Sequence, residues 1–158
     1  MLAQPVSASM DYTVQQGETL YSIAKRYDVK LGTLIAVNPS IADPYEINEN
    51  QEIIIPDGKG TPFTVTAYTA GKESTNKEEG DPGYGVTASG STVEENRTIA
   101  CPASLDFGTS IHIPELKETF VCEDRGSAIT SGHLDIYMKD LDKALNFGVQ
   151  ELQVQIIE

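Results

Sequence analysis

The sequence predicts an α+β protein in which a small module of two strands and two helices precedes a mainly β domain. Apolar residues at helical spacing between two strand-like runs predict the module. Short β-rich runs separated by Gly or Pro predict the second domain, a barrel or sandwich. The run IIIPDGKGTP has the composition of a linker. We therefore expect an N-terminal arm at 1–10, a first domain at 11–56, a linker at 57–61 and a second domain at 62–158.

Composition restricts the functions available to the chain. Its 158 residues are 39% hydrophobic, which is ordinary for globular domains. It has 11 Lys and Arg against 24 Asp and Glu, so it lacks the basic surface that nucleic-acid binding needs. No apolar run approaches the roughly 18 residues of a membrane span. We expect neither a nucleic-acid partner nor a membrane-spanning helix.

The first domain has the element order strand, helix, helix, strand. Residues 11–14 form the first strand, and Thr19 can cap a helix whose apolar face has the spacing i, i+3, i+4, i+7 at Leu20, Ile23, Ala24 and Tyr27. The second helix carries Leu31, Leu34 and Ile35. It stops at Asn38-Pro39, because proline cannot continue a helix. Residues 52–55 form the closing strand.

This first segment resembles a LysM domain over nearly its whole length. The most specific parts are the opening YTVQQGETLYSIAKRY, the Asn38-Pro39 pair and the finish from Gln51 to Pro56. The resemblance implies a βααβ module that binds chains containing N-acetylglucosamine, chiefly peptidoglycan or chitin. It also implies a shallow sugar groove between the loop after the first strand and the loop after the second helix.

Carried onto this sequence, the groove loops are 17–21 and 38–41. The candidate sugar-binding residues are Gly17, Glu18, Thr19, Leu20, Asn38, Pro39 and Ile41. Backbone groups, best those of Glu18 and Thr19, would hold the N-acetyl groups while Leu20 and Ile41 meet methyl and ring faces. The alternative for Leu20 is a place in the core of the first helix.

The second domain is expected to hold seven short strands, at PFTVTAY, GVTAS, TIAC, SIHI, TFVCE, LDIY and LQVQII. One helix is expected in MKDLDKALNFG, where Leu141, Ala144 and Leu145 share a face and Gly148 provides the stop. Residues 72–85 lack apolar periodicity and are expected to form an exposed loop.

The runs TAYTAG, GVTASG, ACPASLDFGTSIHI, FVCEDRGSAI and LDIYMKDLDKALNFG, in this order, resemble the 3D or "three-aspartate" domain. The resemblance covers almost the whole second domain. It implies a double-psi β-barrel related to the membrane-bound lytic transglycosylase A, and a peptidoglycan-degrading activity. Members of this family often follow one or more LysM modules.

Each of the three family aspartates is matched separately to a position in this sequence. Asp124 in EDRG matches the second, and Asp135 in LDIY matches the third. The first normally lies in a V-D-P element, which is Cys101-Pro102 here, so a cysteine replaces it. Asp106 does not align with that position, although a substitute role for it is an alternative.

The two cysteines, Cys101 and Cys122, are expected to form a disulfide, because their number is even and the protein is expected to act outside the cytoplasm. Closing a loop of about twenty residues stabilises by roughly 3 kcal/mol in the chain-entropy model. The alternative is a pair of reduced, buried cysteines that act as small hydrophobes.

By analogy with the family, Asp135 is the catalytic acid and base, and Asp124 is its electrostatic and positioning partner. Burial and repulsion from Asp124 would raise the pKa of Asp135 enough for proton donation. Thr69 and Thr87 are candidate hydrogen-bonding residues on the wall of the cleft.

The remaining candidates receive plainer interpretations. Tyr68 and Tyr137 are assigned to the core. His112 is expected to face solvent, and His133 precedes the LDIY strand. Neither the histidines nor the cysteines have metal-ligand spacing, so we predict no metal and no organic cofactor.

Two functions follow from this sequence. The first is a lytic transglycosylase that acts on peptidoglycan strands, and the second is a non-catalytic wall-binding or tail-tip adaptor that keeps the barrel as a scaffold. The start MLAQPVSASM lacks the features of a secretory signal. A peptidoglycan target implies an extracellular or cell-wall location. Because a secretory signal is not seen, we also expect a phage virion as an alternative setting, with tail or other virion proteins as partners.

Overall fold

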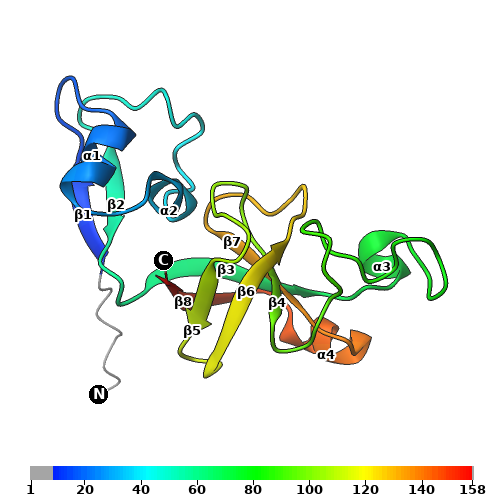
Figure 1. The fold of residues 1–158 in the computed structure, drawn as a ribbon. Coiled ribbons are helices and arrows are strands. Elements are labelled where there is room, and N and C mark those ends of the chain that lie inside the picture. The colour runs from blue at the N-terminus through cyan, green and yellow to red at the C-terminus, as the bar shows by residue number, and fades with distance from the viewer. Residues whose placement is uncertain (1–8, 158) are drawn as a thin grey trace, which may run out of the picture.

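The N-terminal module consists of two strands and two helices, as the sequence predicts. The computed structural model describes residues 9–157, so residues 1–8 of the expected arm lie outside it. The elements are β1 (Ser9–Thr13), α1 (Leu20–Arg26), α2 (Leu31–Ala36) and β2 (Glu52–Pro56). The two strands pair in antiparallel orientation, with Tyr12 opposite Ile53, beside both helices (Figure 1).

Helix α1 begins at the predicted cap. The Thr19 hydroxyl accepts a hydrogen bond from the Ser22 backbone N–H, and the Ser22 hydroxyl accepts one from the Thr19 N–H. This reciprocal capping box satisfies two N–H groups that a helix start leaves unpaired. The buried face of α1 then packs into a core formed by Val14, Leu20, Ile23, Ala24, Leu34, Ile41, Ile53 and Ile55.

The second domain is a closed barrel of six strands. Its elements are β3 (Thr61–Tyr68), α3 (Lys72–Thr75), β4 (Thr98–Ala100), β5 (Ser110–Ile113), β6 (Glu118–Asp124), β7 (His133–Tyr137), α4 (Leu141–Phe147) and β8 (Gln150–Ile157). Around the barrel the order is β3-β7-β4-β6-β5-β8, with parallel pairs β3–β7 and β4–β6. The predicted barrel is confirmed. Strand β3 already begins at Thr61, the last residue of the expected linker.

Two local predictions for this domain differ from the structure. Residues 85–89 are not a strand. They form a turn with one isolated bridge, Val86 to Thr92, because the Thr87 hydroxyl and N–H both bond to the Ser91 carbonyl. The expected loop at 72–85 contains the short helix α3.

Helix α4 lies in the predicted segment and ends at the predicted glycine, but it exposes much of its apolar face. The Asp140 side chain accepts a hydrogen bond from the Lys143 N–H, and Gly148 follows the helix with a φ of 61°. Of the three apolar residues expected to share a face, only Ala144 is buried, whereas Leu141 and Leu145 are exposed. One face of this short helix is therefore open to solvent.

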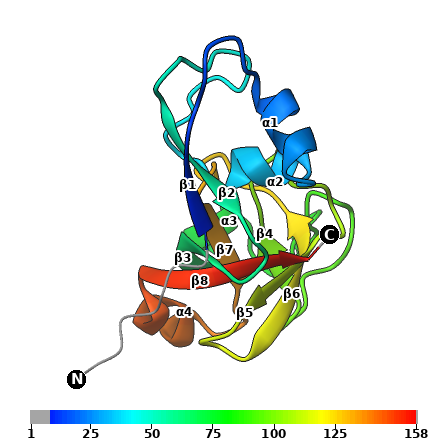
Figure 2. The same ribbon diagram turned by 90° about the vertical axis from the view of Figure 1, so that its left-hand side faces the viewer.

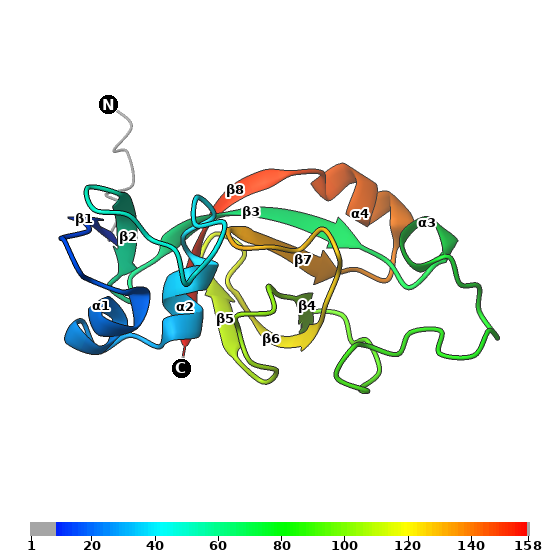
Figure 3. The ribbon, with the colours of Figure 1, turned by 90° about the horizontal axis from the view of Figure 1, so that it is seen from above.

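The module is docked on the barrel through α2. Ala36 and Val37, at the end of α2, are buried in the same apolar cluster as the barrel residues Phe63, Ile99 and Leu134. Figure 3 places α2 between α1 and the barrel strands, and Figure 2 places the module above β8. The two domains thus share apolar contacts as well as a linker.

Backbone contacts fix this docking. The Gly132 N–H, in the loop before β7, donates to the Ala36 carbonyl at 2.7 Å. A Cβ atom on Gly32 would overlap the backbone carbonyl of Ser104, so only glycine allows α2 to approach the barrel this closely.

Among residues 9–157, no helix is both long and apolar enough to cross a bilayer.

Candidate functional site

The structure brings Asp124 and Asp135 to the two sides of one strand. Strand β4 lies between β6 and β7, and its residue Ala100 is paired with Asp124 on one side and with Asp135 on the other. Leu134 and Ile136 point into the barrel core. Asp135, between them, therefore points outward, because side chains alternate along a strand. The two aspartates predicted from the sequence lie on adjacent parts of one outer face.

Asp124 is held by three hydrogen-bond donors. Its Oδ1 accepts from the backbone N–H groups of Ala88 and Arg125, both at 2.9 Å, and its Oδ2 accepts from the Tyr68 hydroxyl at 2.6 Å. A carboxylate acts only as an acceptor, so three donors suit its charged form and fix its orientation. The loop that carries Ala88 is also anchored to β6 by the Ser89 N–H, which donates to the Glu123 carbonyl.

Asp135 has a different environment. Burial raises the pKa of the Asp135 carboxyl, and the negative charge of Asp124 adds to this effect. A hydrogen bond of 2.8 Å from the Thr66 hydroxyl to Asp135 Oδ1, and the proximity of His133, act in the opposite direction. The net shift is upward, as expected from the sequence. Of the pair, Asp135 is the carboxyl suited to donating a proton.

Tyr68 belongs to this site, which corrects its assignment to the core. It is only half-buried, its hydroxyl donates to Asp124, and its ring contacts Tyr137 edge-on at 5.7 Å between centroids. Burial raises the pKa of Tyr68, and the charges of Asp124 and Asp135 raise it further. Tyr68 therefore stays protonated and connects the surroundings of the two aspartates, whereas Tyr137 is buried as predicted.

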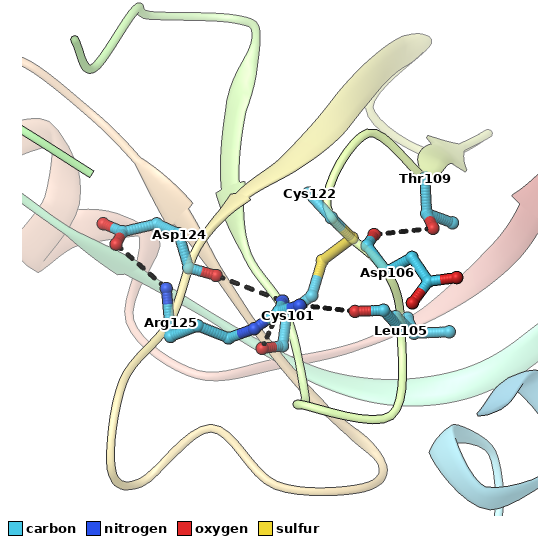
Figure 4. Close-up of a disulfide and its surroundings, with 7 residues drawn as sticks. All are labelled: Cys101, Leu105, Asp106, Thr109, Cys122, Asp124 and Arg125. Atoms are coloured by element: carbon cyan, nitrogen blue, oxygen red, sulfur yellow. Dashed lines mark hydrogen bonds between the residues drawn. A yellow bond between two sulfur atoms is a disulfide. The ribbon is translucent and has the colours of Figure 1, made fainter. Parts of the chain in front are cut away.

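The predicted disulfide between Cys101 and Cys122 is present, with 5.6 Å between the Cα atoms. Figure 4 shows it beside Asp124: the Cys101 N–H donates to the Asp124 carbonyl at 3.2 Å. The Arg125 side chain donates to the carbonyls of Cys101, at 3.1 Å, and Leu105, at 2.5 Å. The disulfide and Arg125 together hold the end of β6, where Asp124 lies.

Asp106 does not take the place of the absent aspartate. It is exposed in the turn before β5, and its backbone carbonyl accepts a hydrogen bond from the Thr109 hydroxyl. In Figure 4 its carboxylate points away from that of Asp124. The alternative that Asp106 substitutes for the first family aspartate is therefore not supported by its position.

Thr69 and Thr87 differ from their expected role on the cleft wall. Both are buried, at 4% and 5% exposure, and both hydroxyls bond within their own turns. The Thr69 hydroxyl donates to Glu73 of α3, and that of Thr87 lies within hydrogen-bonding distance of Ser89 and Ser91. The second turn presents the Ala88 N–H to Asp124, so Thr87 supports the site from behind.

In the N-terminal module, the apolar side chains expected to meet the sugar are in the core. Leu20 is 1% exposed and Ile41 is 7% exposed, and both belong to the buried cluster of the module. The Asn38 side chain is buried as well, donating to the carbonyls of Leu34 and Ile54 and accepting from the Ile54 N–H. The core alternative for Leu20 is therefore confirmed, and the expected sugar contact from the Ile41 side chain is wrong.

The exposed residues of the two groove loops are Gly17, Thr19, Tyr21, Pro39 and Ser40, and Glu18 is half-buried. The Glu18 N–H donates to the Gln15 carbonyl, and the Thr19 N–H is engaged in the capping box. A sugar bound here must use carbonyl oxygens or exchange one of these hydrogen bonds. The Glu18 carboxylate is paired with Arg26 and accepts a hydrogen bond from Tyr12.

No group of three or more His, Cys, Asp and Glu within residues 9–157 is arranged to hold a metal ion.

Comparison with known families identifies both parts of the chain. The LysM domain family matches residues 12–56, and the 3D domain family matches residues 97–158. The chain contains a LysM domain at residues 12–56 and a 3D domain that includes residues 97–158. The first match coincides with the module from β1 to β2, and the second contains both aspartates and five of the six barrel strands.

Individual relatives are similar over parts of the chain. The secreted LysM effector ECP6 of Passalora fulva is 27% identical over 124 residues, which cover 68% of this chain and 54% of the effector. The esterase Rv1288 of Mycobacterium tuberculosis is 45% identical over 58 residues, covering 35% of this chain and 12% of the esterase. The chain thus spans about half of the first relative and a small part of the second.

Among solved structures, MltA from Escherichia coli aligns with 95% of this chain and 48% of its own, with a TM-score of 0.40 and 14% sequence identity. LysM domains bind glycans that contain N-acetylglucosamine, such as peptidoglycan and chitin.

The sequence motifs predict Asp124 and Asp135 as site residues, but they do not predict the residues that hold these two side chains. Thr66 and Tyr68 lie on β3, where Phe63 and Val65 fill the core and the intervening residues face outward. This alternation is visible in PFTVTAY. It places Thr66 and Tyr68 on one face, but the sequence does not show that β3 pairs with β7 and sets Thr66 against Asp135.

Proposed function

We propose that the protein is a peptidoglycan lytic transglycosylase, directed to its substrate by the LysM domain. The observation that carries the proposal is the pair of unlike carboxyl groups beside Ala100. Asp124 has three hydrogen-bond donors, whereas the pKa of Asp135 is raised by burial and by the charge of Asp124. Pairs of carboxyl groups in unlike environments are typical of glycan-cleaving sites.

In the proposed reaction Asp135 acts first as an acid and then as a base. Its proton passes to the glycosidic oxygen as the bond from the anomeric carbon of N-acetylmuramic acid to that oxygen breaks. The C6 hydroxyl of the same sugar then bonds to the anomeric carbon, and its proton passes to the Asp135 carboxylate. The products are a 1,6-anhydro end and a free hydroxyl that holds the proton from Asp135, and Asp135 is protonated again by the proton of the C6 hydroxyl.

Asp124 would support this reaction through its charge. Its negative charge lies on the outer barrel face where positive charge develops on the sugar ring in an oxocarbenium-like transition state. It also contributes to the raised pKa of Asp135. The bonds from Tyr68, Ala88 and Arg125 keep the Asp124 carboxylate from turning away, so its role is electrostatic and positional.

The LysM domain would add retention on the polymer. A single shallow groove binds weakly, but a second site on the same chain keeps the enzyme near the strand after each cleavage. The docking of α2 on the barrel fixes the direction of the groove loops relative to the two aspartates. The expected place of action is the bacterial cell wall.

One observation favours a second function. The resemblance to the 3D family implies an aspartate at position 101. This chain has Cys101 there, which forms a disulfide and has no carboxylate. A wall-binding adaptor that keeps the barrel as a scaffold fits this replacement. A phage virion as the setting stays a prediction, on which neither the fold nor the site bears.

The reaction type is tested by its products. Purified Gram-positive sacculi are incubated with the full chain, and the soluble fragments are analysed by mass spectrometry. Muropeptides that end in 1,6-anhydro-N-acetylmuramic acid are expected. Reducing ends would indicate hydrolysis instead, and sedimentation with the sacculi without any soluble fragment would favour the adaptor.

A further inference from the structure

Three side chains form a continuous row that ends at Asp135. The Thr66 hydroxyl oxygen lies 2.8 Å from Asp135 Oδ1 and 2.9 Å from His133 Nε2. The other imidazole nitrogen, Nδ1 of His133, lies 3.1 Å from the backbone carbonyl of Ala128. The Leu134 carbonyl is a longer contact of the Thr66 hydroxyl, at 3.4 Å. The pairing of β3 with β7 sets Thr66 directly beside Asp135.

The partners in this row determine where its protons can lie. A backbone carbonyl only accepts hydrogen bonds, so Nδ1 of His133 must carry a proton to bond with Ala128. In neutral imidazole the other nitrogen, Nε2, is then an acceptor. The Thr66 hydroxyl has a single proton, which it can donate either to Asp135 or to Nε2.

This single proton links the states of the two end groups. When Asp135 is protonated at Oδ1, it can donate to Thr66, which donates to Nε2 of neutral His133. When Asp135 is ionised, Thr66 donates to Oδ1, and Nε2 completes the row only if it carries a proton. The two arrangements contain the same number of protons, so a proton on one end group replaces a proton on the other.

We propose that Asp135, Thr66 and His133 form a proton relay in which His133, acting through the Thr66 hydroxyl, controls the protonation of Asp135. The relay rests on the proposed function, since Asp135 is its reacting group. Half-buried His133 exchanges protons with water. When its imidazolium gives the Nε2 proton to the Thr66 oxygen, the Thr66 hydroxyl gives its own proton to Asp135. One proton moves, and Thr66 is unchanged.

Other charged groups near Asp135 do not replace this relay. Asp124, on β6, raises the pKa of Asp135 but contributes no proton, because its oxygens accept from Tyr68, Ala88 and Arg125. Tyr68, on β3, stays protonated because burial and both carboxylates raise its pKa. Strand β4 presents only Ala100 at this level. His133 and Thr66 are thus positioning residues for Asp135.

The experiment is an NMR titration of the substrate-free full chain. The side-chain carboxyl carbon of Asp135 reports its protonation, and the imidazole nitrogens report the tautomer of His133. We expect the titration midpoint of Asp135 to move to higher pH in His133→Gln and in Thr66→Val, since each variant removes an interaction that lowers its pKa. Neutral His133 is expected to carry its proton on Nδ1.

Two matched variants serve as controls. Thr66→Ser keeps the hydroxyl, and His112→Gln removes the other histidine, which is bonded to Thr119 on β6. Both are expected to leave the Asp135 midpoint unchanged, and the amide spectrum of each variant reports whether it is folded.

A double-variant cycle tests the path through Thr66. In a Thr66→Val background, His133→Gln should move the Asp135 midpoint much less than it does in the wild type. The relay is wrong if His133→Gln moves the Asp135 midpoint equally in both backgrounds, or if it leaves that midpoint unchanged in the wild type. It is also wrong if neutral His133 carries its proton on Nε2. Because no substrate is present, inactive protein would count against the proposed function and not against the relay.

Discussion

At the residue scale, the burial of Asp135 suits its proposed catalytic role and lowers the stability of the fold above acid pH. A carboxyl whose pKa is raised on folding binds its proton more tightly in the folded chain than in the unfolded one. Between the unfolded and the folded pKa the folded state therefore holds more protons, and stability falls as the pH rises through that window. Residues at functional sites commonly lower the stability of the folded state in this way.

Asp135→Asn should remove this cost. Relative to the wild type, the free energy of unfolding of this variant is expected to rise as the pH increases from the ordinary pKa of an aspartate to the raised pKa of Asp135, and to level off above it. The pH-dependent difference vanishes at acid pH, where Asp135 is neutral in both states. Urea unfolding at several pH values measures it, with exposed Asp106→Asn as the control. A constant difference at every pH would contradict the burial assigned to Asp135.

Tyr68→Phe tests the support of Asp124. The variant removes one hydrogen bond to the carboxylate and keeps the ring contact with Tyr137, so kcat is expected to fall about 10- to 100-fold, with little change in folding. Tyr137→Phe, which alters the other ring of the same pair, should leave kcat near the wild-type value. Equal losses would indicate that packing of the rings matters and the Asp124 bond does not.

The aspartates themselves could be predicted from the sequence, because short motifs surround them. Tyr68 and Thr66 could not, because an aromatic or threonine residue in a strand fits a core or a solvent face equally well. Only the closure of the barrel decides which face is near the carboxyl groups. The burial of Leu20 was similarly open between core and groove until the packing of α1 was known.

At the element scale, the loop between β1 and α1 is the exposed part of the proposed sugar groove. Gly17 has a φ of 81°, a left-handed conformation that other residues adopt only at a cost. A Cβ atom there would meet no other atom, so a substitution acts through the backbone alone. Gly58, in the linker, has a φ of 79° and equally open surroundings, which makes it a matched control.

Gly17→Ala and Gly58→Ala should therefore destabilise the protein by similar amounts, about 1 to 2 kcal/mol each. Only Gly17→Ala is expected to weaken binding to peptidoglycan, because it alters the groove loop. Sedimentation with sacculi at several protein concentrations measures the binding. Equal binding by the two variants would place the sugar elsewhere on the LysM domain.

Elements with a local cause were predictable. The cap at Thr19, the stop at Asn38-Pro39 and the glycine after α4 each act within one turn of chain. The segment GVTAS was misjudged because its composition favours a strand, whereas the hydroxyls of Thr87, Ser89 and Ser91 bond to one another and form a turn. Side chains that bond locally compete with strand pairing.

At the scale of the whole molecule, the docking of the two domains depends on the absence of a side chain at Gly32. In an isolated helix, Gly→Ala gains about 1 kcal/mol of stability. Here the added methyl group would overlap the Ser104 carbonyl, so Gly32→Ala is expected to destabilise the full chain by about 1 to 3 kcal/mol. Thermal unfolding gives the sign. A stabilised variant would indicate that the domains are not docked through α2.

The order of domains and the barrel could be predicted from motifs that follow one another along the chain. The docking could not, because Ala36 and Val37 carry no signal that separates the core of their own module from that of the barrel. Contacts between residues distant in sequence depend on the complete fold.

The proposed function requires that Asp135 moves the proton in glycan cleavage. The most direct measurement compares the yield of 1,6-anhydro muropeptides from purified sacculi for the wild type, Asp135→Asn and Asp106→Asn, with binding to sacculi measured in parallel. We predict that Asp135→Asn binds normally and releases no anhydro product, while Asp106→Asn matches the wild type. Equal yields from all three proteins would contradict the role assigned to Asp135.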